Sequence, residues 1–187
     1  MTTIEHSNRI IAHYEANWRS EGEKLRLPRG PIHDLPTDFC VLKFSPSVSR
    51  RMWTYATCCM SQPDDSERIE LHMFSPYESD DAVEVLTAVA HYHRTGDRLG
   101  LGHTVNFGRP WIGDSECDRG FVSLPYLDGP KLEKLMIDGQ LVASFYWLIP
   151  ISESEVEYKK AHGVEALEIK FDEAKFNYLD PNRASVV

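Results

Sequence analysis

Residues Leu141 to Ile149 form a nearly continuous apolar run, broken only by Ser144. The run is too short to cross a bilayer, which takes ~20 apolar residues. It is also too uniformly apolar for a strand with one face in water. Strands buried on both faces, at the centre of a covered sheet, have this composition. The run therefore predicts a central strand buried on both sides.

Further strands are expected before the stretch rich in glycine and proline that begins at Gly96, and that stretch is expected to carry only short strands. Residues 39–44 and 52–57 are rich in aromatic and β-branched side chains, which favour strands. Residues 69–74 alternate Ile69, Leu71 and Met73 against Glu70, His72 and Phe74. Short strands are predicted around residues 103–107 and 120–124.

Helices are predicted at the N-terminus, in the middle and near the end of the chain. Residues 1–23 place apolar side chains on one face at helical spacing. Two Ser-x-x-Glu sequences have the form of a capping box, which marks a helix start. The first, Ser75–Glu78, predicts a helix to about Arg94 that is closed by Gly96. The second, Ser152–Glu155, predicts a helix to about His162, and a further helix is predicted over residues 164–174.

The order of these elements indicates one domain. A chain of 187 residues can bury one hydrophobic core, and no repeat or linker divides it. We therefore predict a single α/β (α+β) domain over residues 1–187, with helices packed on a mixed β-sheet.

The formal net charge of −9 bears on the class of partner. Nucleic acid is not expected, because binding phosphates requires clustered Lys and Arg. A negative surface suits a basic protein partner, although it would also serve solubility alone. With no secretory leader and no membrane span in the sequence, we expect a cytoplasmic protein. No cofactor motif is present, so no cofactor is expected.

The four cysteines are Cys40, Cys58, Cys59 and Cys117. In a cytoplasmic protein we expect reduced and mostly buried thiols. No sequence signature of a cysteine enzyme surrounds any of them.

Several segments, in their order and spacing, resemble the suppressor of fused domain family. Among them are Trp53-Thr54-Tyr55-Ala56-Thr57 with Met60-Ser61, Leu101-Gly102-His103-Thr104, and Trp147-Leu148-Ile149-Pro150-Ile151. The resemblance covers about residues 38–187. One departure is Cys59, which stands where the family usually has glycine before Met-Ser, so the turn there is expected to differ.

The resemblance implies protein binding and not catalysis. The chain looks like a stand-alone bacterial member of the family, many of which are thought to be immunity proteins in polymorphic toxin systems. For such a stand-alone member, the resemblance implies binding and neutralisation of a toxin or effector domain. An alternative is a regulatory module that binds another cytoplasmic protein, such as a transcription factor.

A metal-dependent hydrolase is a second alternative, with Glu70, His72, His93 and His103 as candidate ligands. These residues lack the spacing of known metal motifs. We favour the interpretation that they are polar anchors of the structure, and we predict no metal site and no catalytic residue.

Candidate partner-binding residues come from loops that carry aromatic or acidic side chains. Aromatic residues next to prolines often anchor partners, which singles out Trp111 and Tyr126. Acidic side chains near them could meet a basic partner. The full set of candidates is Trp111, Asp114, Glu116, Asp118, Tyr126 and Asp128.

Overall fold

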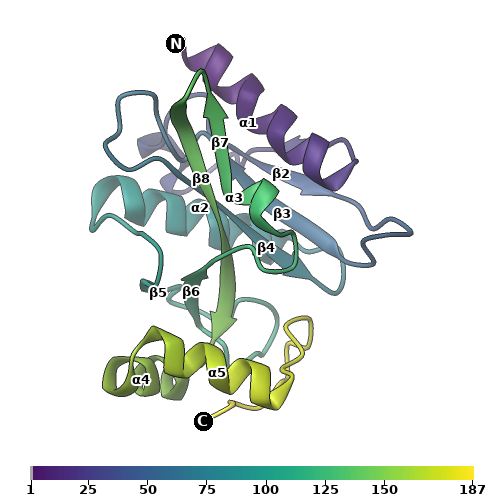
Figure 1. Cartoon of the computed structure of the whole chain (residues 1–187), viewed down its shortest axis with the longest axis vertical. Coiled ribbons are helices and arrows are strands. Elements are labelled where there is room, and N and C mark those ends of the chain that lie inside the picture. The colour runs from purple at the N-terminus through teal and green to yellow at the C-terminus, as the bar shows by residue number, and fades with distance from the viewer. Residues whose placement is uncertain (1) are drawn as a thin grey trace.

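The computed structural model describes residues 2–187, in which one mixed sheet is covered by helices on both faces (Figure 1). The strands run in the order β1-β2-β3-β4-β8-β6-β5, and β7 pairs with β8. All pairs are antiparallel except β4 with β8. The strands are β1 Glu23–Leu25, β2 Cys40–Phe44, β3 Trp53–Cys58, β4 Ile69–Ser75, β5 Thr104–Asn106, β6 Arg119–Ser123, β7 Lys134–Ile137 and β8 Gln140–Ile151.

Helices lie on both faces of this sheet. In Figure 1, α1 lies near the top, and α4 and α5 lie together at the bottom, beside the C-terminus. None of the helices in residues 2–187 is long and apolar enough to span a bilayer. The helices are α1 Thr3–Trp18, the 3₁₀ helix η1 Pro31–Asp34, α2 Asp80–Thr95, α3 Pro130–Glu133, α4 Glu153–His162 and α5 Val164–Ala174.

The apolar run predicted as a central strand makes up most of β8, which confirms the prediction except at Leu141, whose side chain is exposed. One edge of β8 pairs with β4, and the other edge pairs with β7 and then β6. Its side chains alternate between two cores, as the twofold period of a strand requires. Leu148 packs with the residues under α2, whereas Phe145 lies under α1 and Trp147 lies under α5. Helices α1 and α5 therefore share one face of the sheet, and α2 covers the other.

Strand β4 confirms its prediction, and both of its faces are buried. Leu71 and Met73 belong to the core under α2. The other members of the alternation, Glu70, His72 and Phe74, point to the opposite face and are shielded by other elements instead of water. Burying a charged group requires hydrogen bonds, and Glu70 has them. Neither ring nitrogen of His72 forms a hydrogen bond with the residues that the structure describes.

The helix boundaries agree with the sequence in part. The last helix, α5, has the predicted bounds. The capping box at Ser152 is confirmed: its Oγ accepts from the Glu155 amide, and the Glu155 carboxylate accepts from the Ser152 amide at 2.9 Å. The predicted N-terminal helix ends earlier, at Trp18, and residues 23–25 instead form the edge strand β1.

The capping box predicted at Ser75 is wrong. Strand β4 continues through Ser75, which pairs with Trp53 on β3. The Ser75 hydroxyl donates to the carbonyl oxygen of Tyr77 at 2.6 Å, and α2 begins only at Asp80, after Ser79. Pairing in the sheet therefore prevails over the local helix signal.

Cys59, the departure from the family pattern, follows β3 directly. Its φ is +67°, in the left-handed region that glycine adopts at little cost. The turn thus keeps a conformation suited to glycine, even though a side chain with a Cβ occupies the position. The thiol is buried, and all four cysteines are free and buried, as predicted.

Candidate functional site

The acidic loop that precedes β6 is held by its own backbone. The Trp111 amide donates to the Cys117 carbonyl oxygen at 2.9 Å, and the Ser115 hydroxyl accepts from the Cys117 amide at 3.1 Å. Asp114 and Glu116 are exposed on this loop, and neither forms an ion pair with any residue in the described part of the chain. The loop thus offers two carboxylates to a partner.

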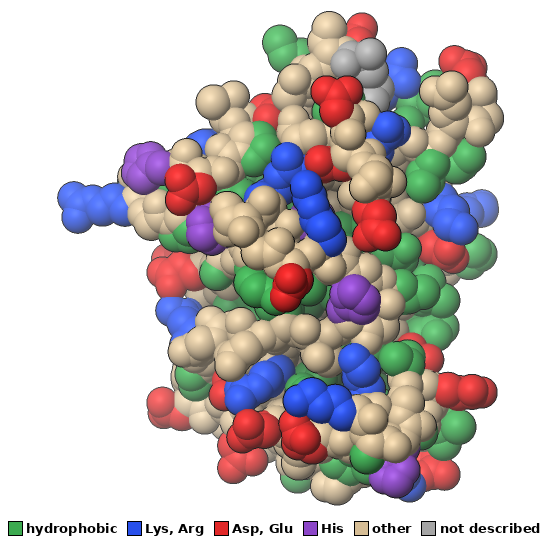
Figure 2. Space-filling model, turned by 90° about the vertical axis from the view of Figure 1, so that its left-hand side faces the viewer, with side chains coloured by type: hydrophobic (Ala, Val, Ile, Leu, Met, Phe, Trp, Pro, Cys, Tyr) green, Lys and Arg blue, Asp and Glu red, His purple; other side chains and the backbone are tan. Residues whose placement is uncertain are grey.

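Other acidic side chains are neutralised locally. Asp118, the third acid of this loop, pairs with Arg119 at 2.5 Å, and Arg119 also reaches Glu153 at 3.1 Å. Figure 2 shows a face of the molecule on which acidic and basic side chains are interspersed. On that face the net charge of −9 does not form a continuous acidic field.

Trp111 is not available as a surface anchor. Its side chain is 1% exposed and lies in the core beneath α2, with Val85 and Leu86. The position of Trp111 in a loop suggested exposure, but its ring points inward. The chain after Trp111 turns back, so that the Trp111 amide bonds the Cys117 carbonyl oxygen. The expectation that Trp111 contacts a partner is therefore corrected: the residue packs the core.

Tyr126 is 60% exposed, on the loop between β6 and α3. Its hydroxyl donates to the Glu168 carboxylate on α5 at 3.3 Å, and the Ser123 hydroxyl donates to the same oxygen at 3.0 Å. A groove of about 690 Å³, which we call the α5 groove, separates this loop from α5. Its lining residues are Ser123, Tyr126, Leu127, Trp147, Ile149, Glu165, Glu168, Ile169, Phe171, Asp172, Lys175, Phe176 and Tyr178.

Asp128 holds this loop in place through a side chain that points into the protein, so it does not face a partner. Its side chain is only 4% exposed. It forms an ion pair with Arg50 and accepts from the Trp18 indole at 2.9 Å. His72 Nε2 lies 3.5 Å from the same carboxylate, but burial lowers the pKa of His72 to about 3, so the ring is neutral. The prediction of Asp128 as a contact residue is corrected for this reason.

The candidate metal ligands lie in separate surroundings. Glu70 accepts hydrogen bonds from the hydroxyls of Thr57 and Ser61, both at 2.6 Å, and from the amides of Ser61 and Met60. Burial raises its pKa to about 7, and these four donors oppose the rise. Within residues 2–187, no three His, Cys, Asp or Glu side chains are grouped as a metal site requires.

The two remaining histidines have different positions. His93 is buried at the end of α2, where its Nδ1 accepts from the Leu99 amide at 2.9 Å. His103 is exposed in the loop before β5. His93 therefore fastens the loop that follows α2, in line with its interpretation as a polar anchor. The interpretation does not extend to His72, whose ring nitrogens form no hydrogen bond within residues 2–187.

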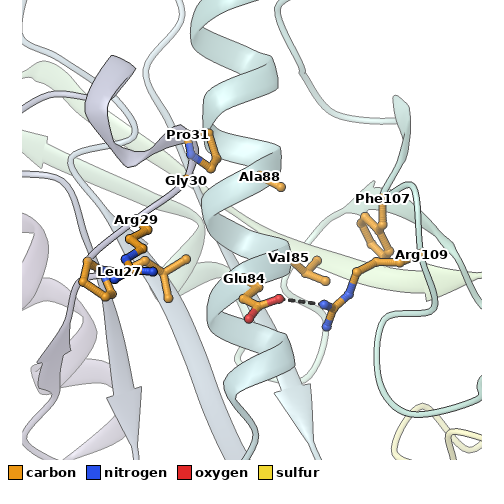
Figure 3. A pocket seen from close by; sticks show the side chains of 10 residues that line it. Leu27, Arg29, Gly30, Pro31, Glu84, Val85, Ala88, Phe107 and Arg109 are labelled. Carbon is orange, nitrogen blue, oxygen red and sulfur yellow. Dashed lines mark hydrogen bonds and ion pairs between the residues drawn. The ribbon is translucent and has the colours of Figure 1, made fainter.

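A second cavity, of about 440 Å³, lies between α2 and the loop at residues 27–31 (Figure 3). Val85, Ala88 and Phe107 give it an apolar lining. Arg109 pairs with Glu84 at 2.6 Å and with Asp81 along one side. Of the two basic side chains that line this cavity, Arg29 and Arg109, Arg109 is therefore already engaged by the protein's own acids.

Apart from Tyr126, the residues of the α5 groove were not predicted from the sequence, although a signal for them is present. Glu165, Glu168, Ile169 and Asp172 are spaced i, i+3, i+4 and i+7, so they form one stripe on α5. Leu167 and Phe171 occupy the adjacent buried face. A stripe of acids around one isoleucine is a solvated face by default, and only the loop with Tyr126 turns it into the wall of a groove.

Comparison with known proteins identifies the family. A sequence model described as Suppressor of fused protein (SUFU) matches residues 36–184. The chain belongs to the suppressor of fused family. A protein described as a suppressor of fused homolog from Neisseria gonorrhoeae is similar over 98% of both chains, with 33% identity and a TM-score of 0.86.

Two further solved structures share the fold of this suppressor of fused chain at 14% identity. One is the Sufu–Fu complex, with a TM-score of 0.70 over 97% of this chain and 92% of that chain. The other is Drosophila Suppressor of Fused, with a TM-score of 0.67 over 95% of this chain and 50% of that one. No curated protein sequence gives a significant match.

Proposed function

We propose that this suppressor of fused chain is a non-catalytic binding protein that captures and neutralises a basic toxin or effector domain in the bacterial cytoplasm. The observation that carries the proposal is the family match over residues 36–184, because a structure of the same fold is of a complex, Sufu–Fu. The net charge of −9 supports a basic partner, since opposite charge speeds association.

The mechanism is occlusion of the partner's working surface. Asp114 and Glu116 project from a loop whose backbone is fixed, so their charges can attract the partner before contact. Tyr126 offers a ring with a polar tip, a side chain that anchors many interfaces. Binding through a preformed surface loses little conformational entropy.

Co-purification from the native cells at low salt tests this function. The tagged protein should retain one basic protein at near-equal stoichiometry, and co-expression should suppress the toxicity of that protein. The charge reversal Asp114→Lys/Glu116→Lys should weaken retention while leaving the fold intact. A matched reversal at Glu157 and Glu173, on the two C-terminal helices, controls for overall charge.

The outcomes separate the proposal from its alternative. Capture of a non-toxic transcription factor would favour the regulatory function. A toxin gene beside the gene for this chain would favour immunity. If no protein is retained under gentle conditions, a stoichiometric binding function is contradicted.

A further inference from the structure

We infer that the α5 groove is the anchoring site for a basic segment of the partner protein, which inserts an apolar side chain between Tyr126 and Ile169. This inference rests on the proposed binding function and adds the site and the chemistry of the bound segment. Three features of the groove support it: exposed apolar side chains, acids without ion pairs, and a wall that is already fixed.

Apolar side chains are exposed together at the mouth of the groove. Tyr126 is 60% exposed, and Leu127 and Ile169 are each 49% exposed. Trp147 and Phe171, each 4% exposed, lie deeper. Single exposed apolar residues are common, but a group of them around a concave site marks a binding surface. The volume of about 690 Å³ is in the range of sites that enclose a ligand, so a few side chains can enter.

The α5 wall carries acids that the protein itself does not neutralise. Glu165, Glu168 and Asp172 form no ion pair with any side chain of residues 2–187. On the same helix Glu173 pairs with Lys170 at 2.8 Å, away from the groove. Lys175 is the one basic side chain among the lining residues. The groove therefore has an acidic side that suits lysine or arginine.

The charges also decide between possible occupants. A second copy of this chain carries a net charge of −9, so docking it here would bring like charges together. An acidic segment is disfavoured for the same reason. A segment with apolar side chains flanked by Lys or Arg satisfies both the apolar lining and the carboxylates.

The wall opposite α5 is already in place. Tyr126 is held through its hydroxyl by Glu168, and the same loop is fastened from below where Asp128 meets Arg50 and Trp18. Because both walls are already ordered, binding of the segment costs little conformational entropy in the groove.

Nuclear magnetic resonance with the full-length ¹⁵N-labelled protein tests the inference. The probe is a synthetic peptide with a central Leu-Trp-Leu and lysines on both sides, and the control peptide has glutamates in place of the lysines. The basic peptide should shift the amide signals of Tyr126, Leu127 and Ile169, and added salt should weaken its binding. The acidic peptide should leave them unchanged.

Variants separate the groove from general acidity. The double change Glu165→Gln/Asp172→Asn should lower the affinity for the basic peptide by about tenfold, as expected for losing two partly exposed charges. Ile169→Ser should weaken binding without changing charge. The matched change Glu157→Gln/Glu173→Gln also removes two carboxylates but leaves the groove intact, and it should have no effect.

Several results would overturn the inference: absence of binding by the basic peptide, shifts confined to the loop with Asp114 and Glu116, or equal losses in the groove and control variants. The proposed function is judged separately. If the groove variants still retain the cellular partner in full, the function stands and the groove is not its site.

Discussion

Arg183 and Glu155 form a two-bonded ion pair that is almost fully shielded from solvent. Arg183 Nη1 lies 2.6 Å from Glu155 Oε1, and Nη2 lies 2.8 Å from Oε2. The side chains are 7% and 0% exposed. Arg183 belongs to the segment after α5, whereas Glu155 is part of the capping box of α4. The pair therefore fastens the segment after α5 to the start of α4.

Replacing Arg183 with methionine should destabilise the domain strongly. The change leaves the buried Glu155 carboxylate without its partner, which costs about 3–5 kcal/mol in comparable buried pairs. Urea unfolding gives the free energy of unfolding. Arg109→Met is the matched control, because Arg109 forms exposed pairs with Asp81 and Glu84 that contribute at most about 1 kcal/mol. Equal effects of the two changes would show that the buried pair has no special role.

Trp111 and Tyr126 should respond differently to truncation. Trp111→Ala removes a fully buried ring and should cost about 3–5 kcal/mol of stability. Tyr126→Ala removes a mostly exposed ring and one hydrogen bond, and should cost about 1 kcal/mol or less. Thermal unfolding of both variants checks this. A small loss for Trp111→Ala would mean that the ring is not packed as described.

Most strands and the C-terminal helices could be predicted because their signals are local, whereas the short strands β1 and β7 were not predicted. The apolar run in β8 reports burial on both faces, and the capping box at Ser152 contains both of its hydrogen-bonding partners within four residues. The same Ser-x-x-Glu pattern failed at Ser75, where pairing with Trp53 extends β4. A local pattern does not contain that information, because the strand partner is distant in sequence.

The candidate site depended on contacts that a sequence does not show. Asp128 looked like a surface acid, but it meets Arg50, which is 78 positions away in the chain. Trp111 and Tyr126 both stand beside a proline in a loop, yet one fills the core and the other is exposed. Their difference arises from the turns that follow them. The α5 groove likewise exists only because the loop with Tyr126 lies across from α5.

Cys59 allows the cost of its backbone conformation to be measured. Cys59→Gly and Cys59→Ala both remove the thiol, but only alanine keeps a Cβ in the left-handed region at φ +67°. The glycine variant should therefore be more stable than the alanine variant by about 1–2 kcal/mol. Urea unfolding of the pair tests this prediction. Equal stability would mean that the turn relaxes to a conformation without this penalty.

His93 should make the domain sensitive to acid. Burial, together with Arg98 and Arg94, lowers the pKa of His93 to about 4, below the ordinary value of 6.5. Between these values the unfolded chain binds a proton that the folded domain does not, so stability is present above about pH 6.5 and is lost as the pH falls toward 4. His72 acts in the same direction, because its pKa is lowered to about 3.

The variant His93→Asn removes the titrating ring and keeps an acceptor, its Oδ1, near the Leu99 amide. Its free energy of unfolding should therefore fall less steeply than that of the wild type between about pH 7 and about pH 4.5. The remaining slope in this variant includes the contribution of His72. Urea unfolding at several pH values measures both slopes. Because the prediction concerns the slope, a constant loss of stability from imperfect packing of asparagine does not affect it, whereas identical slopes would show that His93 does not set the acid limit.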